Sequence, residues 1–257
     1  MWKILKTRFQ QGHRTSDYPK GPSGLPERFR GRPTVSIEPC AQGCSACADS
    51  CPTQAIAVAE GGRVRLDLGK CLFCTECATA CPEGAISYTT DHRMAARARE
   101  DLVLSGPEAR LAEALDEKAR RLFGRSLKLR EVCAGSCNGC EAELTALNNV
   151  VFDLSRFGVQ FVASPRHADG LVVTGPVTDH MRAALRAAYD AVPAPKLVIA
   201  VGACAISGGP FASSPQAHDG ADSTVPVDLY IPGCPPHPLT ILDGLLRLLG
   251  RLETQGQ

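Results

Sequence analysis

The feature that most constrains this chain is a run of four closely spaced cysteines, Cys71, Cys74, Cys77 and Cys81, followed directly by Pro82. Three thiols two residues apart wrap a short loop around one corner of an iron–sulfur cube, and the fourth leaves on the next turn toward a second cube. Structural zinc is the alternative, because zinc also uses C-x2-C pairs. Zinc, however, joins two such pairs across a longer gap. The run therefore predicts 4Fe–4S clusters.

An earlier run of cysteines repeats this pattern with one extra residue in its first gap. The similarity continues into Pro-Thr-Gln-Ala-Ile and Pro-Glu-Gly-Ala-Ile, so the segment is an internal duplication. In duplicated runs of this type each cluster takes its fourth cysteine from the other run. The first cluster is assigned Cys40, Cys44, Cys47 and Cys81, and the second Cys71, Cys74, Cys77 and Cys51. The extra residue makes Cys40 the ligand whose position is least certain from spacing.

The remaining composition narrows the function class. Thirteen cysteines are an odd number, and no secretory signal peptide opens the sequence, so a disulfide framework is disfavoured. The longest apolar run, ten residues from Leu197 to Ile206, is too short to span a bilayer. A net charge of +1 argues against nucleic acid as a partner. The N-terminal 35 residues are the exception, because they carry a local net charge of +6.

Charge and composition divide the sequence into four segments. Residues 1–35 form a basic docking segment, 36–90 the cysteine-rich domain, 91–126 a helical linker, and 127–252 a larger α/β domain. The linker is rich in charge and poor in glycine, which favours two helices. The second helix is expected to begin at Pro107, because proline suits the first helical position.

Short apolar runs alternate with helical stretches in the last segment. Strands are expected at 126–132, 158–163, 170–173, 196–201 and 227–231, and helices at 142–155, 181–189 and 238–249. Nearly all-apolar strands that alternate with helices imply a parallel sheet covered on both faces. The carboxyl ends of such strands meet at one edge of the sheet, where cofactors usually bind.

Four cysteines follow three of these expected strands. They are Cys137, Cys140, Cys204 and Cys234, and glycines lie beside each of them. Three loops that deliver four thiolates to one edge predict a third 4Fe–4S cluster. The alternative is four unrelated core cysteines, since free cysteine is often buried. Cys133 lies outside the pattern and is interpreted as a buried or free thiol, not a ligand.

The two halves of the chain resemble two known families. The N-terminal third, including Arg28–Pro33, resembles the dicluster ferredoxin-like subunit of formate hydrogenlyase-type hydrogenases and of complex I. Residues 126–252 resemble the small electron-transfer subunit, the 20 kDa family of complex I, which is shared with membrane-bound nickel–iron hydrogenases. The motifs that carry this second resemblance are Gly135–Glu141, Ser164–Asp169, Thr174–Thr178, Gly202–Cys204 and Pro226–Pro236. The chain is therefore expected to be a fusion of the two subunits.

This resemblance implies a fold and a role. The expected fold class is α/β, a flavodoxin-like parallel sheet domain preceded by a small α+β dicluster ferredoxin domain and a helical linker. The expected role is that of an electron-transfer subunit with three 4Fe–4S clusters and no substrate chemistry of its own. Its partners would be a catalytic large subunit, membrane-arm subunits and a soluble electron donor or acceptor. It would be peripheral at the cytoplasmic face of the cell membrane, without a transmembrane helix.

Two alternatives to a hydrogenase subunit stay open at the level of sequence. One is a subunit of a complex I-like quinone oxidoreductase without nickel, and the other is a stand-alone soluble polyferredoxin. The two-residue gap between Cys137 and Cys140 and the run Ser207-Gly-Gly-Pro resemble the hydrogenase branch.

Three polar residues near the expected third cluster are candidates for supporting roles. Glu141 is a candidate proton relay, or a carboxylate that only stabilises a helix N-terminus. His237 and His167 are candidate hydrogen-bond donors to sulfur, although an isolated histidine is more often structural.

Overall fold

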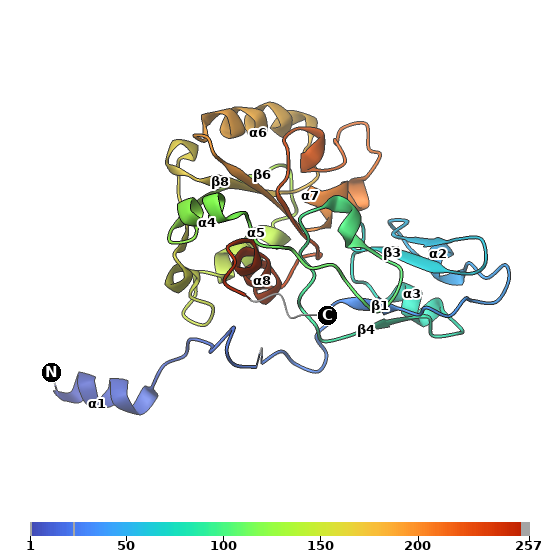
Figure 1. Cartoon of the computed structure of the whole chain (residues 1–257), viewed down its shortest axis with the longest axis horizontal. Coiled ribbons are helices and arrows are strands. Elements are labelled where there is room, and N and C mark those ends of the chain that lie inside the picture. Colours follow the sequence, from blue (N-terminus) through green and yellow to red (C-terminus); the bar gives the residue numbers. More distant parts are fainter. Residues whose placement is uncertain (1, 23, 253–257) are drawn as a thin grey trace.

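A five-stranded parallel sheet organises the C-terminal part of the computed structural model, which describes residues 2–22 and 24–252 (Figure 1). Its strands are β6 (Leu127–Cys133), β7 (Val159–Phe161), β8 (Gly170–Thr174), β9 (Leu197–Val201) and β10 (Leu229–Ile231). They lie in the order β7-β6-β8-β9-β10, and every neighbouring pair is parallel. In chain order this is 2-1-3-4-5, the flavodoxin-like arrangement. The predicted fold class of this domain is confirmed.

Helices cover both faces of the sheet. The helices α5 (Gly139–Ala146) and α8 (Pro238–Leu248) lie on one face, and α6 (Asp179–Ala191) and α7 (Ala203–Ser207) on the other (Figure 1). Strands β8 and β9 are buried along their full length, as a doubly covered parallel sheet requires. Four short 3-10 helices lie in the loops: η2 (Leu154–Phe157), η3 (Pro165–His167), η4 (Gly209–Phe211) and η5 (Ala221–Ser223).

The cysteine-rich module is a small α+β unit built from a repeat. Its helices are α2 (Ala46–Asp49) and α3 (Glu76–Ala80), and its strands are β1 (Pro33–Val35), β2 (Ile56–Val58), β3 (Val64–Asp67), β4 (Ile86–Tyr88) and β5 (Val103–Leu104). The pair α2–β2 recurs as α3–β4, and β2 and β4 share one burial pattern. Strand β1 pairs antiparallel with β4, so this module includes residues that the sequence assigned to the docking segment.

The linker is largely extended, which corrects the expectation of two helices. Only η1 (Arg99–Leu102) and α4 (Glu117–Phe123) are helical. No helix begins at Pro107, because the backbone there bonds to distant elements instead of to itself. The Ala112 amide donates to Ala95 O (2.7 Å), and the Leu115 amide to Leu248 O (2.9 Å). Helix α4 begins where the Asp116 carboxylate accepts the Ala119 amide (2.9 Å).

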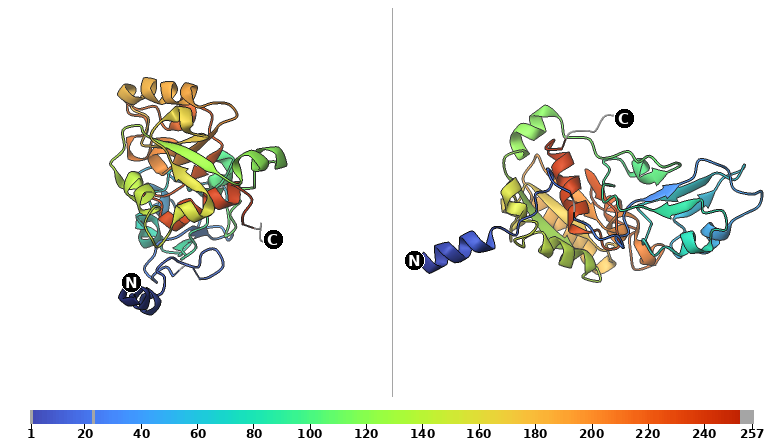
Figure 2. Two further views of the ribbon diagram at one scale, coloured as in Figure 1. Left: turned by 90° about the vertical axis from the view of Figure 1, so that its left-hand side faces the viewer. Right: turned by 90° about the horizontal axis from the view of Figure 1, so that it is seen from below.

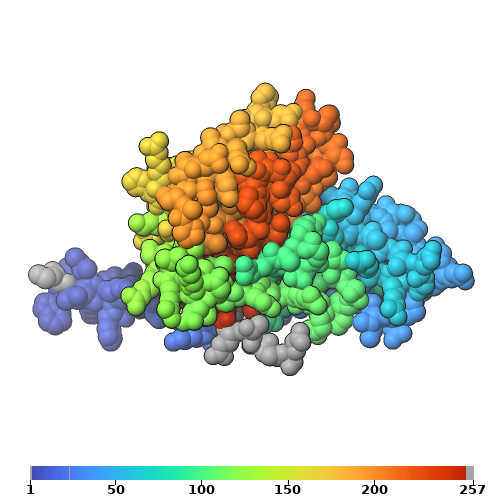
Figure 3. All heavy atoms as spheres, turned by 45° about the horizontal axis from the view of Figure 1, so that its top comes forward, coloured from blue at the N-terminus to red at the C-terminus, as the bar shows by residue number. Residues whose placement is uncertain are grey.

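The cysteine-rich module and the sheet domain share one hydrophobic core. Leu66 of the module, Leu102 of the linker and Ile206 of α7 belong to the same buried cluster. At the contact, the Ser207 hydroxyl donates to Gly69 O (2.8 Å), and a Cβ on Gly69 would lie 2.7 Å from Ile206 Cγ2. The space-filling view shows the two lobes in direct contact, with linker residues along the join (Figure 3). The loop that leads to Cys71 is therefore fixed against α7.

The first part of the basic N-terminal segment is an exposed helix, α1 (Trp2–Gln11). This helix projects from the molecule at the end opposite the cysteine-rich module (Figure 2). Met1 and Ser23 of this segment lie outside the described residues. Trp2 and Phe9 are 85% and 91% exposed, far more than isolated aromatic side chains usually are. No helix within the described ranges is long and apolar enough to cross a membrane.

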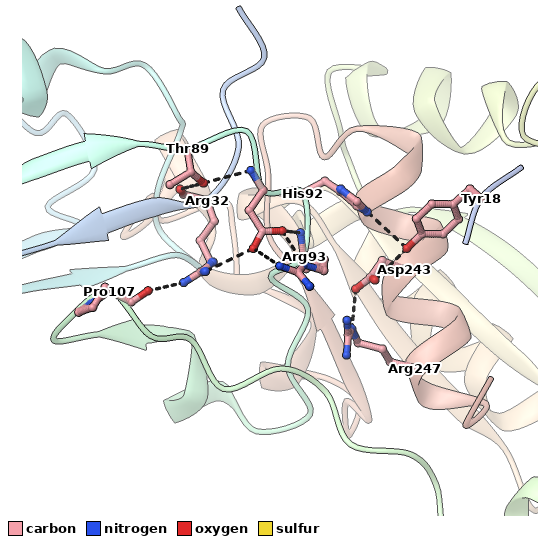
Figure 4. Close-up of polar contacts among 9 residues, drawn as sticks. Tyr18, Arg32, Thr89, His92, Arg93, Pro107, Asp243 and Arg247 are labelled. Carbon is pink, nitrogen blue, oxygen red and sulfur yellow. Dashed lines mark hydrogen bonds and ion pairs between the residues drawn. The ribbon is translucent and has the colours of Figure 1, made fainter. Parts of the chain in front are cut away.

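The part of the N-terminal segment that follows α1 in sequence is anchored to the sheet domain by a buried polar network (Figure 4). The Tyr18 hydroxyl donates to Asp243 Oδ1 (2.9 Å), and Arg247 Nε donates to Asp243 Oδ2 (2.7 Å). His92 Nε2 lies 3.3 Å from the same hydroxyl oxygen. Burial raises the pKa of Tyr18 and lowers the pKa of His92, so both side chains stay neutral. The network joins the N-terminal segment, the linker and α8.

We expect Tyr18→Phe to lower the midpoint of thermal unfolding. The change leaves the buried Asp243 carboxylate without one of its donors, and a hydrogen bond to a charged group contributes about 1.5–3 kcal/mol. Calorimetry of the two proteins measures the difference. Tyr189→Phe is the control, because the Tyr189 ring, not its hydroxyl, contacts Lys196 Nζ at 4.1 Å. Equal midpoints for Tyr18→Phe and the unsubstituted chain would contradict the anchoring role.

Candidate metal centres

The second predicted ligand set lines a single pocket in the cysteine-rich module. Cys51, Cys71, Cys74 and Cys77 all contribute to its wall, together with Tyr88 of β4. Three of these cysteines come from the second run and Cys51 comes from the first. The structure therefore brings together the crossed set that the spacing predicted.

Unusual backbone conformations bring the second set together. Phe73 and Thr75 each lie inside a C-x2-C step and have backbone φ values of 56° and 71°. Residues other than glycine rarely adopt such values. The left-handed residues curl the loop around its sulfurs. As a result, the Phe73 amide donates to Cys71 Sγ (3.3 Å). Strain of this kind is common at functional sites, where the surrounding structure maintains it.

The two repeats present sulfur to the backbone in the same way. The Ala55 amide donates to Cys51 Sγ, and the Ala85 amide donates to Cys81 Sγ, both at 3.2 Å. Amide donors of this kind stabilise negative charge on a ligating sulfur. The internal duplication in the sequence is therefore also a duplication of sulfur environments.

Members of the first predicted ligand set interact electrostatically, despite the extra residue after Cys40. Desolvation and the nearby thiolates of Cys81 and Cys44 raise the pKa of Cys40, and burial and Cys81 raise the pKa of Cys47. The extra residue is accommodated in a turn closed by the Cys44 amide and Ala41 O (3.0 Å), with Gly43 at φ 81°. The extra residue therefore does not move Cys40 away from its predicted neighbours.

The third predicted set lies at the carboxyl edge of the parallel sheet. Cys137 and Cys140 follow β6, Cys204 follows β9 and Cys234 follows β10. Burial raises the pKa of Cys140. The charges of Glu141 and of the other three cysteines of the set raise this pKa further. The four thiols are thus close enough to interact electrostatically, at the edge where flavodoxin-like sheets bind ligands.

Glycine at position 202 is what allows this edge to hold the thiols. Gly202 has φ 90°, and a Cβ there would lie 2.5 Å from Cys140 Sγ. Gly139 also lies beside a ligand, but a Cβ there would stand 3.5 Å from Cys137 Sγ, an ordinary contact. Inside the C-x2-C step, Asn138 is left-handed (φ 70°), as Phe73 and Thr75 are in the other module.

The donor sets fit iron–sulfur clusters better than single metal ions. Four thiolates on one zinc ion at about 2.3 Å would lie within about 4 Å of one another. The thiolates that hold a 4Fe–4S cluster each bind a different iron atom and so stand around the cluster. The second set surrounds a pocket. Burial raises the pKa of Cys71 to about 12 and that of Cys204 to about 11, so both thiols must release a proton on binding iron.

A larger pocket lies between the second and third sets. It is lined by Cys74 of the module and Cys234 of the sheet domain, with His237 beside them. Its other walls include Arg28, Phe29, Arg30, Leu72, Phe73, Met94, Glu143, Gly233, Pro235, Pro236 and Thr240. The Cys74 charge also helps to raise the pKa of Cys234, after burial and Cys137. The second and third sets are therefore neighbours across the domain join.

Glu141 occupies the first turn of α5, beside the third set. Its Oε1 accepts from the Ser136 hydroxyl and from Thr174 Oγ1 (2.5 Å). Burial alone would raise its pKa, but hydrogen bonds from these two hydroxyls, from its own backbone amide and from the Cys133 thiol outweigh burial, and the pKa of Glu141 is lowered. Among the described residues its Oε2 is buried without a hydrogen-bond partner. The carboxylate therefore stays charged, with one oxygen fixed and one oxygen available.

Of the remaining residues singled out from the sequence, His237 caps a helix, and His167 and Cys133 are exposed. His237 Nδ1 accepts the Leu239 amide (3.1 Å) and so caps α8, while its ring packs edge-on against Phe29. His167 is exposed at the end of η3. Cys133 is a free thiol and is exposed, not buried. Its sulfur lies 3.7 Å from the Ser136 hydroxyl.

Sequence reasoning missed one side chain at the second set. The Tyr88 hydroxyl lies 3.8 Å from both Cys71 Sγ and Cys77 Sγ. Burial and these two cysteines raise the pKa of Tyr88. An alignment of the two repeats would have singled out Tyr88, because Val58 occupies the equivalent position.

Two protein-family models match the chain in consecutive segments. The 4Fe-4S dicluster domain matches residues 40–85, and the 20 kDa subunit of NADH ubiquinone oxidoreductase matches residues 137–248. The first match covers both cysteine runs of the module, and the second covers the four cysteines at the sheet edge.

Curated relatives match about half of this chain. A probable membrane-bound hydrogenase subunit of Pyrococcus furiosus is 46% identical over 132 residues, covering 51% of this chain and 79% of that protein. Formate hydrogenlyase subunit 7 of Escherichia coli is 48% identical over 129 residues, covering 50% of this chain and 51% of that protein. An NADH-quinone oxidoreductase subunit of Clostridium beijerinckii is 48% identical over 110 residues, covering 42% of this chain and 65% of that protein. The chain therefore belongs to the family of the 20 kDa subunit of NADH ubiquinone oxidoreductase, with a 4Fe–4S dicluster domain preceding the family domain.

Proposed function

We propose that this chain is the electron-transfer subunit of a membrane-bound, energy-converting hydrogenase. It would hold three 4Fe–4S clusters and relay electrons between a soluble donor or acceptor and a catalytic large subunit. The observation that carries the proposal is the gathering of the cysteines into three sets, with Cys74 of the second and Cys234 of the third on one pocket.

A bound 4Fe–4S cluster supplies one-electron chemistry, with a potential set by burial and by hydrogen bonds to sulfur. The chain's own residues hold the thiolates and direct amide donors at them, as Ala55, Ala85 and Phe73 do. The shared core keeps the module and the sheet domain in a fixed relation. Nickel and substrate chemistry are assigned to the large subunit.

A partner subunit would cover the exposed side of the third set. Cys137 and Cys234 are exposed, whereas Cys140 and Cys204 are partly buried. Solvent exposure changes the potential of a cluster, so a large subunit packed on this edge would complete the site. Glu141 is the proposed proton carrier there, because Oε2 is its free oxygen. Its lowered pKa equally fits an anchoring role at the start of α5.

A complex I-like quinone oxidoreductase is the second candidate. The relatives in Escherichia coli and Clostridium beijerinckii are equally similar, at 48% identity, although their complexes differ by name. The hydrogenase is favoured by the two-residue gap between Cys137 and Cys140, which Asn138 spans in a left-handed conformation. The exposed apolar side chains of α1 argue against a stand-alone polyferredoxin, because an exposed apolar patch marks a surface that contacts a membrane or another protein.

The basic N-terminal segment is proposed to dock the chain against the membrane arm, at the cytoplasmic face of the cell membrane. Trp2, Leu5 and Phe9 lie three and four residues apart on α1, so they share one face. Lys3 and Lys6 add positive charge beside them. Helices that combine exposed aromatic residues with basic ones bind membrane surfaces and their proteins.

The three-cluster assignment predicts about twelve iron atoms and twelve sulfides per chain, without stoichiometric zinc. Anaerobic purification followed by elemental and sulfide analysis measures both. Cys133→Ser should leave the iron content unchanged, because Cys133 lies outside all three sets. About eight iron atoms in the unsubstituted chain would mean that one set does not hold a full cluster.

Two glycine variants provide the matched control for this count. Gly202→Ala should remove about four iron atoms, because its Cβ would meet Cys140 Sγ at 2.5 Å and its φ is 90°. Gly139→Ala should retain them, because the nearest sulfur is 3.5 Å away. Full iron content in Gly202→Ala would contradict the assignment of the third set.

Deletion of residues 1–12 should release the chain from membranes while leaving its iron content unchanged. The deletion removes α1 but keeps the anchor, where Arg156 donates to Ser16 O (2.7 Å) and Tyr18 O (2.9 Å). Membrane sedimentation followed by immunodetection measures the effect. Phe9→Glu should weaken binding, and Gln11→Glu, which adds the same charge, should weaken it less. Unchanged sedimentation after the deletion would place the docking surface elsewhere.

The assembled complex should contain nickel and reduce viologen with hydrogen. Glu141→Gln should slow this turnover if Oε2 carries the proton, because the amide cannot accept it. Hydrogen-dependent viologen reduction by membranes, with nickel analysis of the purified complex, provides the measurement. Quinone reduction without nickel or hydrogen turnover would favour the complex I-like alternative and leave the cluster assignment intact.

A further inference from the structure

Tyr88 places a hydroxyl between two thiols of the second set. It lies on β4 in the wall of the pocket, 3.8 Å from Cys71 Sγ and 3.8 Å from Cys77 Sγ. The Phe73 ring packs edge-on against the Tyr88 ring at 6.4 Å. Strand β4 and the Phe73 ring thus hold the hydroxyl beside the two sulfurs.

The internal repeat shows that this hydroxyl is not a general feature of the module. Val58 on β2 takes the place of Tyr88, and both end strands with the same burial pattern. The amide donors of the repeats, at Ala55 and Ala85, are alike at 3.2 Å. The hydroxyl is therefore a difference between two environments that are otherwise built on one plan.

The direction of this hydrogen bond follows from the ligand chemistry. A cysteine that binds iron is a thiolate without a proton, so the hydroxyl must be the donor. The phenol carries one proton, and its oxygen lies 3.8 Å from Cys71 Sγ and 3.8 Å from Cys77 Sγ. Its single proton is available to either of the two sulfurs.

We infer that Tyr88 raises the reduction potential of the cluster held by Cys71, Cys74, Cys77 and Cys51, and so makes the two clusters of the duplicated module different. The inference rests on the proposed function. Reduction adds negative charge that spreads onto the sulfurs, and a donor to sulfur stabilises the reduced form more than the oxidised form. Since Cys74 and Cys234 share a pocket, the hydroxyl would favour an electron at the set beside the sheet domain.

The test is potentiometric titration of the full-length protein, followed by electron paramagnetic resonance. Tyr88→Phe removes only the hydroxyl, so one of the three midpoint potentials should become more negative while the other two stay unchanged. A proton that exchanges in heavy water and couples to that cluster should also disappear from the double-resonance spectrum. Tyr88→Val, which copies the first repeat, should give the same shift with full iron content.

Each outcome separates this inference from the proposed function. Three unshifted midpoints at full iron content in Tyr88→Phe would overturn the role of Tyr88 and leave the three clusters in place. Loss of the cluster from both variants would make Tyr88 a structural residue and also overturn the inference. An unsubstituted chain without a cluster at the second set would overturn the proposed function itself.

Discussion

Burying negatively charged sulfur is the constraint on which this structure depends. A thiolate taken out of water is disfavoured, as the raised pKa values of Cys71 and Cys140 show. The fold counters this cost with backbone amides directed at sulfur and with left-handed residues that curl the loops around each site. A bound cluster would offset only part of the thiolate charge, so the amide donors would still be needed. The unusual backbone conformations and close-packed glycines follow from this requirement.

The second constraint is the position of the sets relative to one another. The module and the sheet domain are not joined by a free linker. They share a core and meet where Gly69 admits no side chain against Ile206. This contact fixes the loop that carries the second set against α7, the helix that holds Cys204 of the third set. A chain that relays electrons benefits from such rigidity, because the spacing of its centres then does not depend on domain motion.

The sequence predicted the features that depend on local spacing. The crossed set of Cys71, Cys74, Cys77 and Cys51 could be predicted, because its turns are set by two-residue gaps. The parallel sheet could be predicted from its apolar strands. The linker could not, because the Ala112 and Leu115 amides bond to segments far away in sequence. The same holds for Tyr88, whose role depends on which sulfurs β4 reaches.

Anomalous X-ray scattering across the iron edge, from crystals of the anaerobically purified protein, tests the central claim most directly. Our account predicts three separate tetranuclear iron sites, two held by crossed sets in the module and one at the carboxyl edge of the parallel sheet. Fewer sites, uncrossed ligation in the module, or a signal at the zinc edge in place of the iron edge would contradict it.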